Sequence, residues 1–204
     1  MNRLPDDYFT DMYAQDPDPW RFDERWYEHR KRALTVAMLP RRRFRNAFEP
    51  GCSTGALTEM LALRCDELLA TDVVDDVLDT ARARLDGVPG VTFLNWALGD
   101  PWPADMFDLI VLSEVGYYVK PEAFDDVVED VAHHLGPDAV VLAAHWRHPV
   151  SDYPTTGDEV HDALARNPGL IRTARYEDAD VLIETFASAA VPPDSVARRE
   201  GLVD

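Results

Sequence analysis

The strongest signal for the fold is the stretch Ala47-Phe48-Glu49-Pro50-Gly51-Cys52-Ser53-Thr54-Gly55, in which a short apolar run is followed by a turn with two glycines. A helical pattern begins directly after Gly55, so the stretch predicts a strand, a tight turn and a helix in immediate succession. Glycines in such a turn let a ligand approach the backbone, and the free N–H groups of the helix start face it. The spacing is G-x-x-x-G, unlike the G-x-G-x-x-G of dinucleotide sites. An unspecialised tight turn is the alternative interpretation.

The next predicted strand ends in a carboxylate. Asp72 ends the run 67–72 and lies 21 residues after Gly51. In nucleoside-binding α/β folds, an acid at about this distance beyond the glycine turn accepts hydrogen bonds from the ribose hydroxyls. A carboxylate suits vicinal hydroxyls because it accepts two hydrogen bonds at once. The glycine turn and Asp72 together therefore predict a nucleoside-type ligand more strongly than either feature does alone.

Strand-like and helix-like segments alternate along the chain. The predicted helices cover 23–39, 57–62, 75–85, 121–135 and 160–166, and the predicted strands after the glycine turn are 67–72, 91–94, 107–114 and 139–144. Two further runs, 170–176 and 180–186, predict a closing hairpin. This alternation predicts the α/β class, as a Rossmann-like, doubly wound, mostly parallel seven-stranded sheet with a C-terminal antiparallel hairpin strand.

We expect one domain with three parts. The ligand-binding core covers 41–190, an N-terminal arm and helix cover 1–40, and a flexible tail covers 191–204. Two X-Pro steps, Asp16-Pro17 and Asp18-Pro19, disfavour helix and predict an extended, turn-rich arm at the start of the chain. Its aromatic side chains pack either on the flank of the domain or over a ligand, as a lid.

The composition is that of an acidic globular protein. The 204 residues carry 38 acidic and 20 basic side chains, for a formal net charge of −18. Nucleic-acid binders need a basic footprint, so this charge argues against a nucleic-acid partner, although it also serves solubility alone. No apolar run is long enough to span a membrane and no secretory signal is evident, so we expect a cytoplasmic protein. Neither a disulfide framework nor a metal site is predicted, and the oligomeric state is open.

Polar and aromatic residues follow the ends of five successive predicted strands. They are Glu49, Asp72, Trp96-Ala97, Glu114 and His145. Ligands of doubly wound sheets bind outside the carboxyl ends of the strands. We therefore expect these residues to converge on one site.

With these residues placed, the chain resembles a class I S-adenosylmethionine (SAM) methyltransferase, because Glu49-x-Gly51-x-x-x-Gly55 has the form of motif I of that class. More narrowly, it is similar to the nodulation protein S (NodS) family from about Tyr13 to His161. The segments that carry this resemblance are Asp18-Pro-Trp20, Trp26-Tyr-Glu28, Glu49–Gly55, Phe107-Asp-Leu-Ile-Val111, Ser113-Glu-Val-Gly-Tyr-Tyr118, His145-Trp-Arg147 and Gly157-Asp-Glu-Val-His161.

The resemblance implies SAM as the cofactor. The glycine turn would face its methionyl part, Asp72 its ribose, Val73 its adenine, and Arg30 its carboxylate. The sequence departs from many class I enzymes after the third strand, where Trp96-Ala97 stands in place of an acid for the adenine amino group. The full set implied for the cofactor is Trp20, Arg30, Glu49, Gly51, Cys52, Ser53, Gly55, Asp72, Val73, Trp96, Ala97, Leu98 and Ser113.

The NodS family N-methylates the free amine of a deacetylated glucosamine unit, which implies a small-molecule or saccharide acceptor. Methyl transfer is an in-line displacement, so catalysis is mostly positioning and removal of the proton of the nucleophile. We assign His145, Glu114 and Tyr118 to catalysis, with His145 as the base because the ordinary imidazole pKa lies near neutrality. Tyr13, Tyr117 and Arg147 are assigned to acceptor binding.

Two alternatives stay open from the sequence. One is an O-methyltransferase that acts on a sugar or natural-product hydroxyl. The other is a nucleotide-binding or SAM-binding module without chemistry, and the missing third glycine argues against its NAD-binding form.

Overall fold

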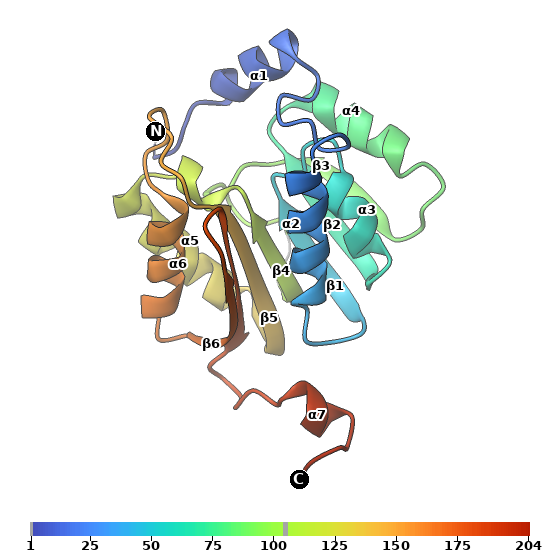
Figure 1. Ribbon diagram of the computed structural model, residues 1–204, viewed down its shortest axis with the longest axis vertical. Helices are drawn as coiled ribbons and strands as arrows, with labels where there is room; N and C mark the ends of the chain where they lie inside the picture. Colours follow the sequence, from blue (N-terminus) through green and yellow to red (C-terminus); the bar gives the residue numbers. More distant parts are fainter. Residues whose placement is uncertain (1, 104–105) are drawn as a thin grey trace.

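A seven-stranded sheet forms the centre of the protein, in a computed structural model that describes residues 2–103 and 106–204 (Figure 1). The strand order is β3-β2-β1-β4-β5-β7-β6. The strands are β1 (Phe44–Pro50), β2 (Cys65–Asp72), β3 (Val91–Asn95), β4 (Phe107–Ser113), β5 (Leu135–Trp146), β6 (Leu170–Glu177) and β7 (Val181–Ser188). The first five strands pair in parallel, whereas β7 is antiparallel to both β5 and β6. The predicted fold class is confirmed.

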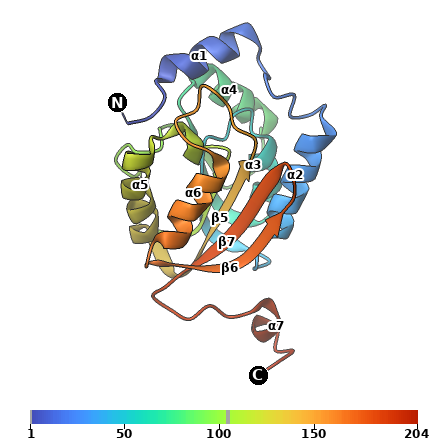
Figure 2. The ribbon, with the colours of Figure 1, turned by 60° about the vertical axis from the view of Figure 1, so that its left-hand side comes forward.

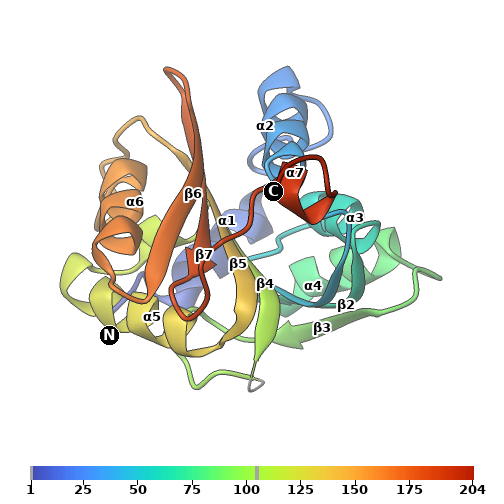
Figure 3. The same cartoon turned by 90° about the horizontal axis from the view of Figure 1, so that it is seen from below.

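Helices cover both faces of this sheet. They are α1 (Asp6–Gln15), α2 (Trp26–Ala37), α3 (Ala56–Ala62), α4 (Asp75–Arg84), the 3₁₀ turn η1 (Gly116–Tyr118), α5 (Pro121–His133), α6 (Gly157–Arg166) and α7 (Val196–Arg199). Figure 3 shows α5 and α6 on one face and α2, α3 and α4 on the other. Figure 2 shows α1 and α7 at opposite ends of the sheet. Every helix of the described residues is too short or too polar to cross a membrane.

Strand β4 shows why the protein has three layers, with helices on both faces of the sheet. Leu109 and Val111 belong to the hydrophobic cluster that includes α3, whereas Ile110 and Leu112 belong to the cluster that includes α5. All four side chains are fully buried. Since successive side chains of a strand point to opposite faces, a central strand of a doubly wound sheet has to be apolar at every position. The apolar run ends at Ser113, so the polar Glu114 emerges at the carboxyl end of the sheet.

The structure of the N-terminal arm and the start of β5 were predicted wrongly. The start of the chain forms helix α1 instead of an extended arm, because the prolines at 17 and 19 restrict only themselves and the residue before each of them. Asp6 and Asp7 in its first turn suit the helix dipole. Further on, Leu135 starts β5 rather than ending α5, and it pairs with Phe107 across a register irregularity. The Gly-Pro step that follows lies at the start of the strand, where proline is tolerated.

Candidate functional site

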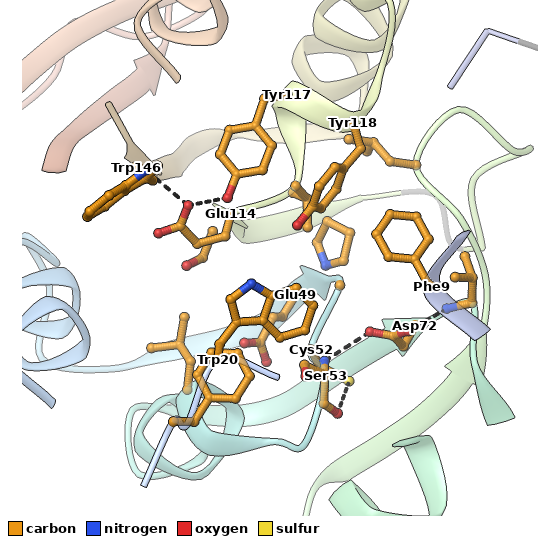
Figure 4. Close-up of a pocket in the computed structure, with 18 of the residues that line it drawn as sticks. Phe9, Trp20, Glu49, Cys52, Ser53, Asp72, Glu114, Tyr117, Tyr118 and Trp146 are labelled. Atoms are coloured by element: carbon orange, nitrogen blue, oxygen red, sulfur yellow. Dashed lines mark hydrogen bonds between the residues drawn. The ribbon is translucent and has the colours of Figure 1, made fainter. Parts of the chain in front are cut away.

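A cavity of about 310 Å³ lies at the carboxyl ends of β1, β2 and β4, under α1 and the segment that follows it (Figure 4). This volume is within the range of small-molecule sites. Of the residues assigned to catalysis, cofactor or acceptor from the sequence, fifteen line it: Tyr13, Trp20, Glu49, Gly51, Cys52, Ser53, Asp72, Val73, Trp96, Ala97, Leu98, Ser113, Glu114, Tyr117 and Tyr118. The expected convergence of the strand ends is therefore present for four of the five strands, and β5 contributes Trp146 in place of His145.

The glycine turn passes against the loop after β4 with no room for a side chain. Gly51 has a φ of 71°, and a Cβ built on it would lie 2.2 Å from Cγ1 of Val115. Ser53 also has a positive φ, of 49°, so the turn holds its backbone in a conformation that L-residues rarely adopt. Gly55, with a φ of 79°, caps the N-terminus of α3 and does not itself line the cavity. Gly55 therefore serves the backbone conformation of the turn.

We expect Gly51→Ala to lower the free energy of unfolding by about 2–5 kcal/mol, through the left-handed φ and the contact with Val115 together. Gly87 is the matched control, since its φ is 76° and a Cβ there meets open space. Gly87→Ala should cost only about 1–2 kcal/mol, the cost of the backbone conformation alone. Urea denaturation of both variants makes the comparison, and equal losses would contradict the close approach at Gly51.

Asp72 joins the glycine turn to the end of β2. Its carboxylate accepts hydrogen bonds from the backbone N–H groups of Ser53 (3.0 Å), Val73 (2.8 Å) and Val74 (3.2 Å). The side chain lies in the cavity wall and is only 7% exposed. Burial raises the pKa of Asp72, and the three backbone hydrogen bonds oppose that rise. The carboxylate thus fixes the turn and faces the cavity at the same time.

Glu49 is a buried acid that lacks a hydrogen-bond partner for one oxygen. The side chain is 2% exposed, and Oε2 has no partner among the described residues. Burial raises the pKa of Glu49 to about 8, and the negative charge of Asp72 contributes to the rise. A carboxyl group with a raised pKa holds its proton more readily, and in the protonated form it can donate a hydrogen bond.

Glu114 stands at the end of β4 in a left-handed conformation, with a φ of 58°. Its Oε1 accepts a hydrogen bond from Nζ of Lys31 at 2.7 Å. Its Oε2 accepts from the N–H of Trp146 at 2.9 Å and from the hydroxyl of Tyr117, as Figure 4 shows. A non-glycine residue in a left-handed conformation, whose side chain is held by several hydrogen-bond donors, is typical of a functional position.

Lys31 and Glu28, both on α2, complete this charged group. Glu28 belongs to a segment that carries the family resemblance, but neither residue was assigned to the site from the sequence. Lys31 is 5% exposed and lies 3.0 Å from Oε2 of Glu28. Burial lowers the pKa of Lys31, but the carboxylates of Glu114 and Glu28 outweigh that effect, so the pKa lies above its ordinary value. The i,i+3 spacing of the two residues was the available signal, because it places them on one helix face.

Aromatic side chains form the wall beside Glu114. Tyr117 stacks on Tyr153 with ring centroids 4.9 Å apart, and Phe9 of α1 meets the ring of Tyr118 edge to face at 4.8 Å. All four line the cavity. The pocket therefore has a polar end at the glycine turn and an aromatic end that holds the half-buried carboxylate of Glu114.

Arg30 does not reach the cavity. Its guanidinium pairs with Asp178 at 2.7 Å and contacts Tyr176, at the hairpin of β6 and β7. Neighbouring positions of a helix point about 100° apart, so Arg30 faces outward when Lys31 faces the cavity. Arg32 lines the cavity instead, and its Nη1 has no hydrogen-bond partner among the described residues. Burial lowers the pKa of Arg32.

His145 and Arg147 also lie outside the cavity. Because side chains alternate along a strand, Trp146 takes the cavity side of β5 and its two neighbours point the other way. Arg147 pairs with Asp158 and Glu177, both at 2.8 Å. His145 is fully buried, and burial holds its pKa well below the ordinary value. The prediction of His145 as the base at the acceptor is therefore withdrawn.

The described residues contain no group of three or more His, Cys, Asp or Glu side chains arranged to hold a metal ion. Fold and site together define a Rossmann-like α/β protein with a small-molecule pocket at the ends of its parallel strands. The sequence model of the nodulation protein S (NodS) family matches residues 8–153, and the chain belongs to this family.

Three similar proteins illustrate the relationship. Nodulation protein S of Rhizobium tropici is 36% identical over 106 residues, which cover 50% of this chain and 43% of that protein. The chain thus matches less than half the length of this relative. The N-methyltransferase NodS of Bradyrhizobium japonicum, solved with S-adenosyl-L-homocysteine (SAH), superposes with a TM-score of 0.81 at 24% identity and covers 90% and 97% of the two chains. A crystal structure from Pseudomonas syringae is 39% identical, with a TM-score of 0.65 and coverages of 80% and 99%.

Proposed function

We propose that this protein is a SAM-dependent methyltransferase that N-methylates an amine on a small molecule, with amino sugars and their oligosaccharides as the favoured acceptors. Family membership supports the reaction class. The observation that carries the proposal is the division of one cavity into two ends. The glycine turn and Asp72 form one end, and Glu114 with its aromatic wall forms the other.

The residues at the first end fit SAM. Arg32 and Glu49 each have a buried polar atom without a hydrogen-bond partner among the described residues, and both side chains line the cavity beside the bare backbone of Gly51. When bound, SAM supplies an electrophilic methyl group on a positively charged sulfur. We assign the methionyl part to the turn at 51–53, the ribose to Asp72, and the adenine to Val73 and residues 96–98. The carboxylate is assigned to Arg32 in place of Arg30.

We expect Arg32→Met to weaken binding of SAH about 10-fold to 100-fold, because a charge-assisted hydrogen bond contributes about 1.5–3 kcal/mol. Arg30→Met is the matched control, since Arg30 lies two positions away on α2 and outside the cavity. Adenosine lacks the carboxylate, so its affinity should stay the same in both variants. Titration calorimetry measures the four values. If Arg32→Met weakened adenosine binding as much as SAH binding, Arg32 would support the shape of the site and would not bind the carboxylate.

At the second end, we assign the acceptor amine to Glu114. An ammonium has no lone pair, so the amine has to react in its neutral form. As its nitrogen attacks, positive charge passes from sulfur to nitrogen, and a fixed carboxylate beside that nitrogen stabilises the developing charge. Lys31, Tyr117 and the N–H of Trp146 hold Glu114 in place before the reaction begins. The released proton then leaves to solvent or buffer.

The N-terminal arm is proposed to close the site. Phe9, Tyr13 and Trp20 line the cavity from the segment before α2, and the hydroxyl of Tyr13 hydrogen-bonds the hydroxyl of Ser53 in the glycine turn. This contact joins the arm to the segment that we assign to the methionyl part of SAM. Excluding water from the reacting atoms strengthens the electrostatic interactions between them.

The test is methyl transfer from radiolabelled SAM to a panel of amino sugars and deacetylated chitooligosaccharides. The matched controls are the same sugars with the amine acetylated, which removes the nucleophile and leaves the hydroxyls. We expect label in the free amines only. Equal label in the acetylated sugars would indicate transfer to oxygen, and label in neither would overturn the proposal for this acceptor class.

A further inference from the structure

Three buried polar side chains lie behind the aromatic wall, and the proposed reaction uses none of them directly. They are His145 of β5, His161 of α6 and Glu184 of β7, with exposed fractions of 0%, 1% and 0%. Nδ1 of His145 lies 3.2 Å from Nε2 of His161, and Nδ1 of His161 lies 2.9 Å from Oε2 of Glu184. The other oxygen of Glu184 accepts hydrogen bonds from Arg172 at 3.0 Å and Arg175 at 2.8 Å.

Chemistry fixes the direction of every hydrogen bond in this chain. Burial raises the pKa of Glu184, but His161 and the two arginines outweigh that effect and hold the pKa below its ordinary value. An ionised carboxylate only accepts hydrogen bonds. Nδ1 of His161 is therefore the donor to it. In a neutral imidazole the second nitrogen then accepts, so His145 donates from Nδ1 and accepts at Nε2. The donor to that Nε2 is the backbone N–H of Gly116, at 3.2 Å.

Gly116 is the first residue of η1, the turn that carries the two tyrosines of the cavity wall. The ring of His145 also meets the ring of Tyr117 edge to face, with centroids 5.3 Å apart. Helix α6 also packs closely against the turn, because a Cβ on Gly116 would lie 2.6 Å from Cγ1 of Val160. The histidine chain and α6 thus hold both the backbone of η1 and the ring of Tyr117, whose hydroxyl donates to Glu114.

The row of hydrogen bonds through Glu184, His161 and His145 does not carry a proton to or from the pocket. It ends on a backbone amide, which keeps its proton at every pH at which the protein is folded. Buried polar groups are also expensive, and an apolar cluster of similar volume often stabilises a core as well or better. This row of hydrogen bonds is costly, has a fixed direction and ends on the turn that carries Tyr117. Its position therefore indicates a role in setting the geometry of that turn.

We propose that His145 and His161, anchored by Glu184, are positioning residues that fix η1 so that Tyr117 holds Glu114 in the orientation the acceptor amine requires. This inference rests on the proposed function. It assigns to His145 an action through Gly116 and Tyr117, not through contact with the acceptor.

Kinetics of two His145 variants test the proposal. His145→Phe keeps a planar ring but leaves the N–H of Gly116 without an acceptor, and we expect kcat for amine methylation to fall about 10-fold or more. The dissociation constant of SAH should stay within about twofold of wild type, because Asp72, to which we assign the ribose, has no contact with η1. His145→Gln places an amide oxygen near the former Nε2, so it should recover most of the rate. The control is His148→Gln, on the same segment but exposed and paired with Asp180.

A second measurement does not depend on activity. Nitrogen NMR of the unmodified protein at neutral pH should show both imidazoles neutral and protonated at Nδ1, with a scalar coupling between Nε2 of His145 and the N–H of Gly116. A proton on Nε2 of His145 would overturn the inference, and so would a folded His145→Phe that methylates amines at the wild-type rate. If the wild-type protein methylates no amine, the proposed function fails and the inference fails with it. In that event the NMR result still reports whether the hydrogen-bond chain exists.

Discussion

Glu114→Gln is expected to lower kcat for amine methylation about 100-fold, because removing one preorganised group that stabilises transition-state charge typically costs 10²-fold to 10³-fold. The substitution keeps the size of the side chain and one acceptor oxygen, but it removes the negative charge beside the acceptor nitrogen. The dissociation constant of SAH should stay within about threefold of wild type, since Asp72 and the glycine turn are unchanged. Steady-state kinetics and calorimetry on the same preparation separate the two effects.

The controls for this variant concern charge and folding. Glu129→Gln removes one negative charge from the exposed face of α5 and should leave the rate unchanged. Lys31 loses one of its two carboxylate partners in Glu114→Gln but keeps Glu28 at 3.0 Å, so we expect a folded protein. A wild-type rate in Glu114→Gln, or a loss of rate that follows a loss of SAH affinity, would contradict the role assigned to this carboxylate.

Asp72→Ala is expected to weaken SAH binding at least about 100-fold. The carboxylate holds the turn through Ser53 and the end of β2 through Val73 and Val74, and we assign the ribose hydroxyls to it as well. Charge-assisted hydrogen bonds contribute about 1.5–3 kcal/mol each, so the loss of two accounts for the expected change. Calorimetry with SAH and with adenosine should show parallel losses, because both ligands carry the ribose.

Asp75→Ala is the matched control for Asp72→Ala. Asp75 lies three residues further on, at the start of α4, and its contact is with the exposed side chain of Asn95. Its removal should leave SAH affinity unchanged. Asp72→Asn, which still accepts from the backbone, should bind SAH with intermediate affinity. Wild-type affinity in Asp72→Ala would remove this residue from the cofactor site.

The fold was predictable because its main signals are local. The continuous apolar run of β4 and the glycine turn after β1 each specify their own element, and alternation of strands and helices then leaves few topologies. Residues at the ends of parallel strands meet at one edge of the sheet whatever the packing of the helices. That is why Glu49, Asp72 and Glu114 were placed correctly in the cavity wall.

What the sequence did not reveal depends on rotation and on distant partners. The helical pattern of α2 did not fix which side chains face the cavity, and a step of one or two residues exchanged Arg30 for Lys31 and Arg32. The same step on β5 exchanged His145 for Trp146, because neighbouring residues of a strand face opposite sides. His145 gained its surroundings from His161 and Glu184, which follow 16 and 39 residues later. No local pattern brings such groups together.

Calorimetric titration of the wild-type protein with SAH and, separately, with NAD tests the proposed cofactor site most directly. We expect the wild-type protein to bind one SAH per chain, through the glycine turn at 51–53 and Asp72, and to give no heat with NAD. Binding of NAD without binding of SAH would contradict the assignment of the pocket, and with it the proposed methyl transfer.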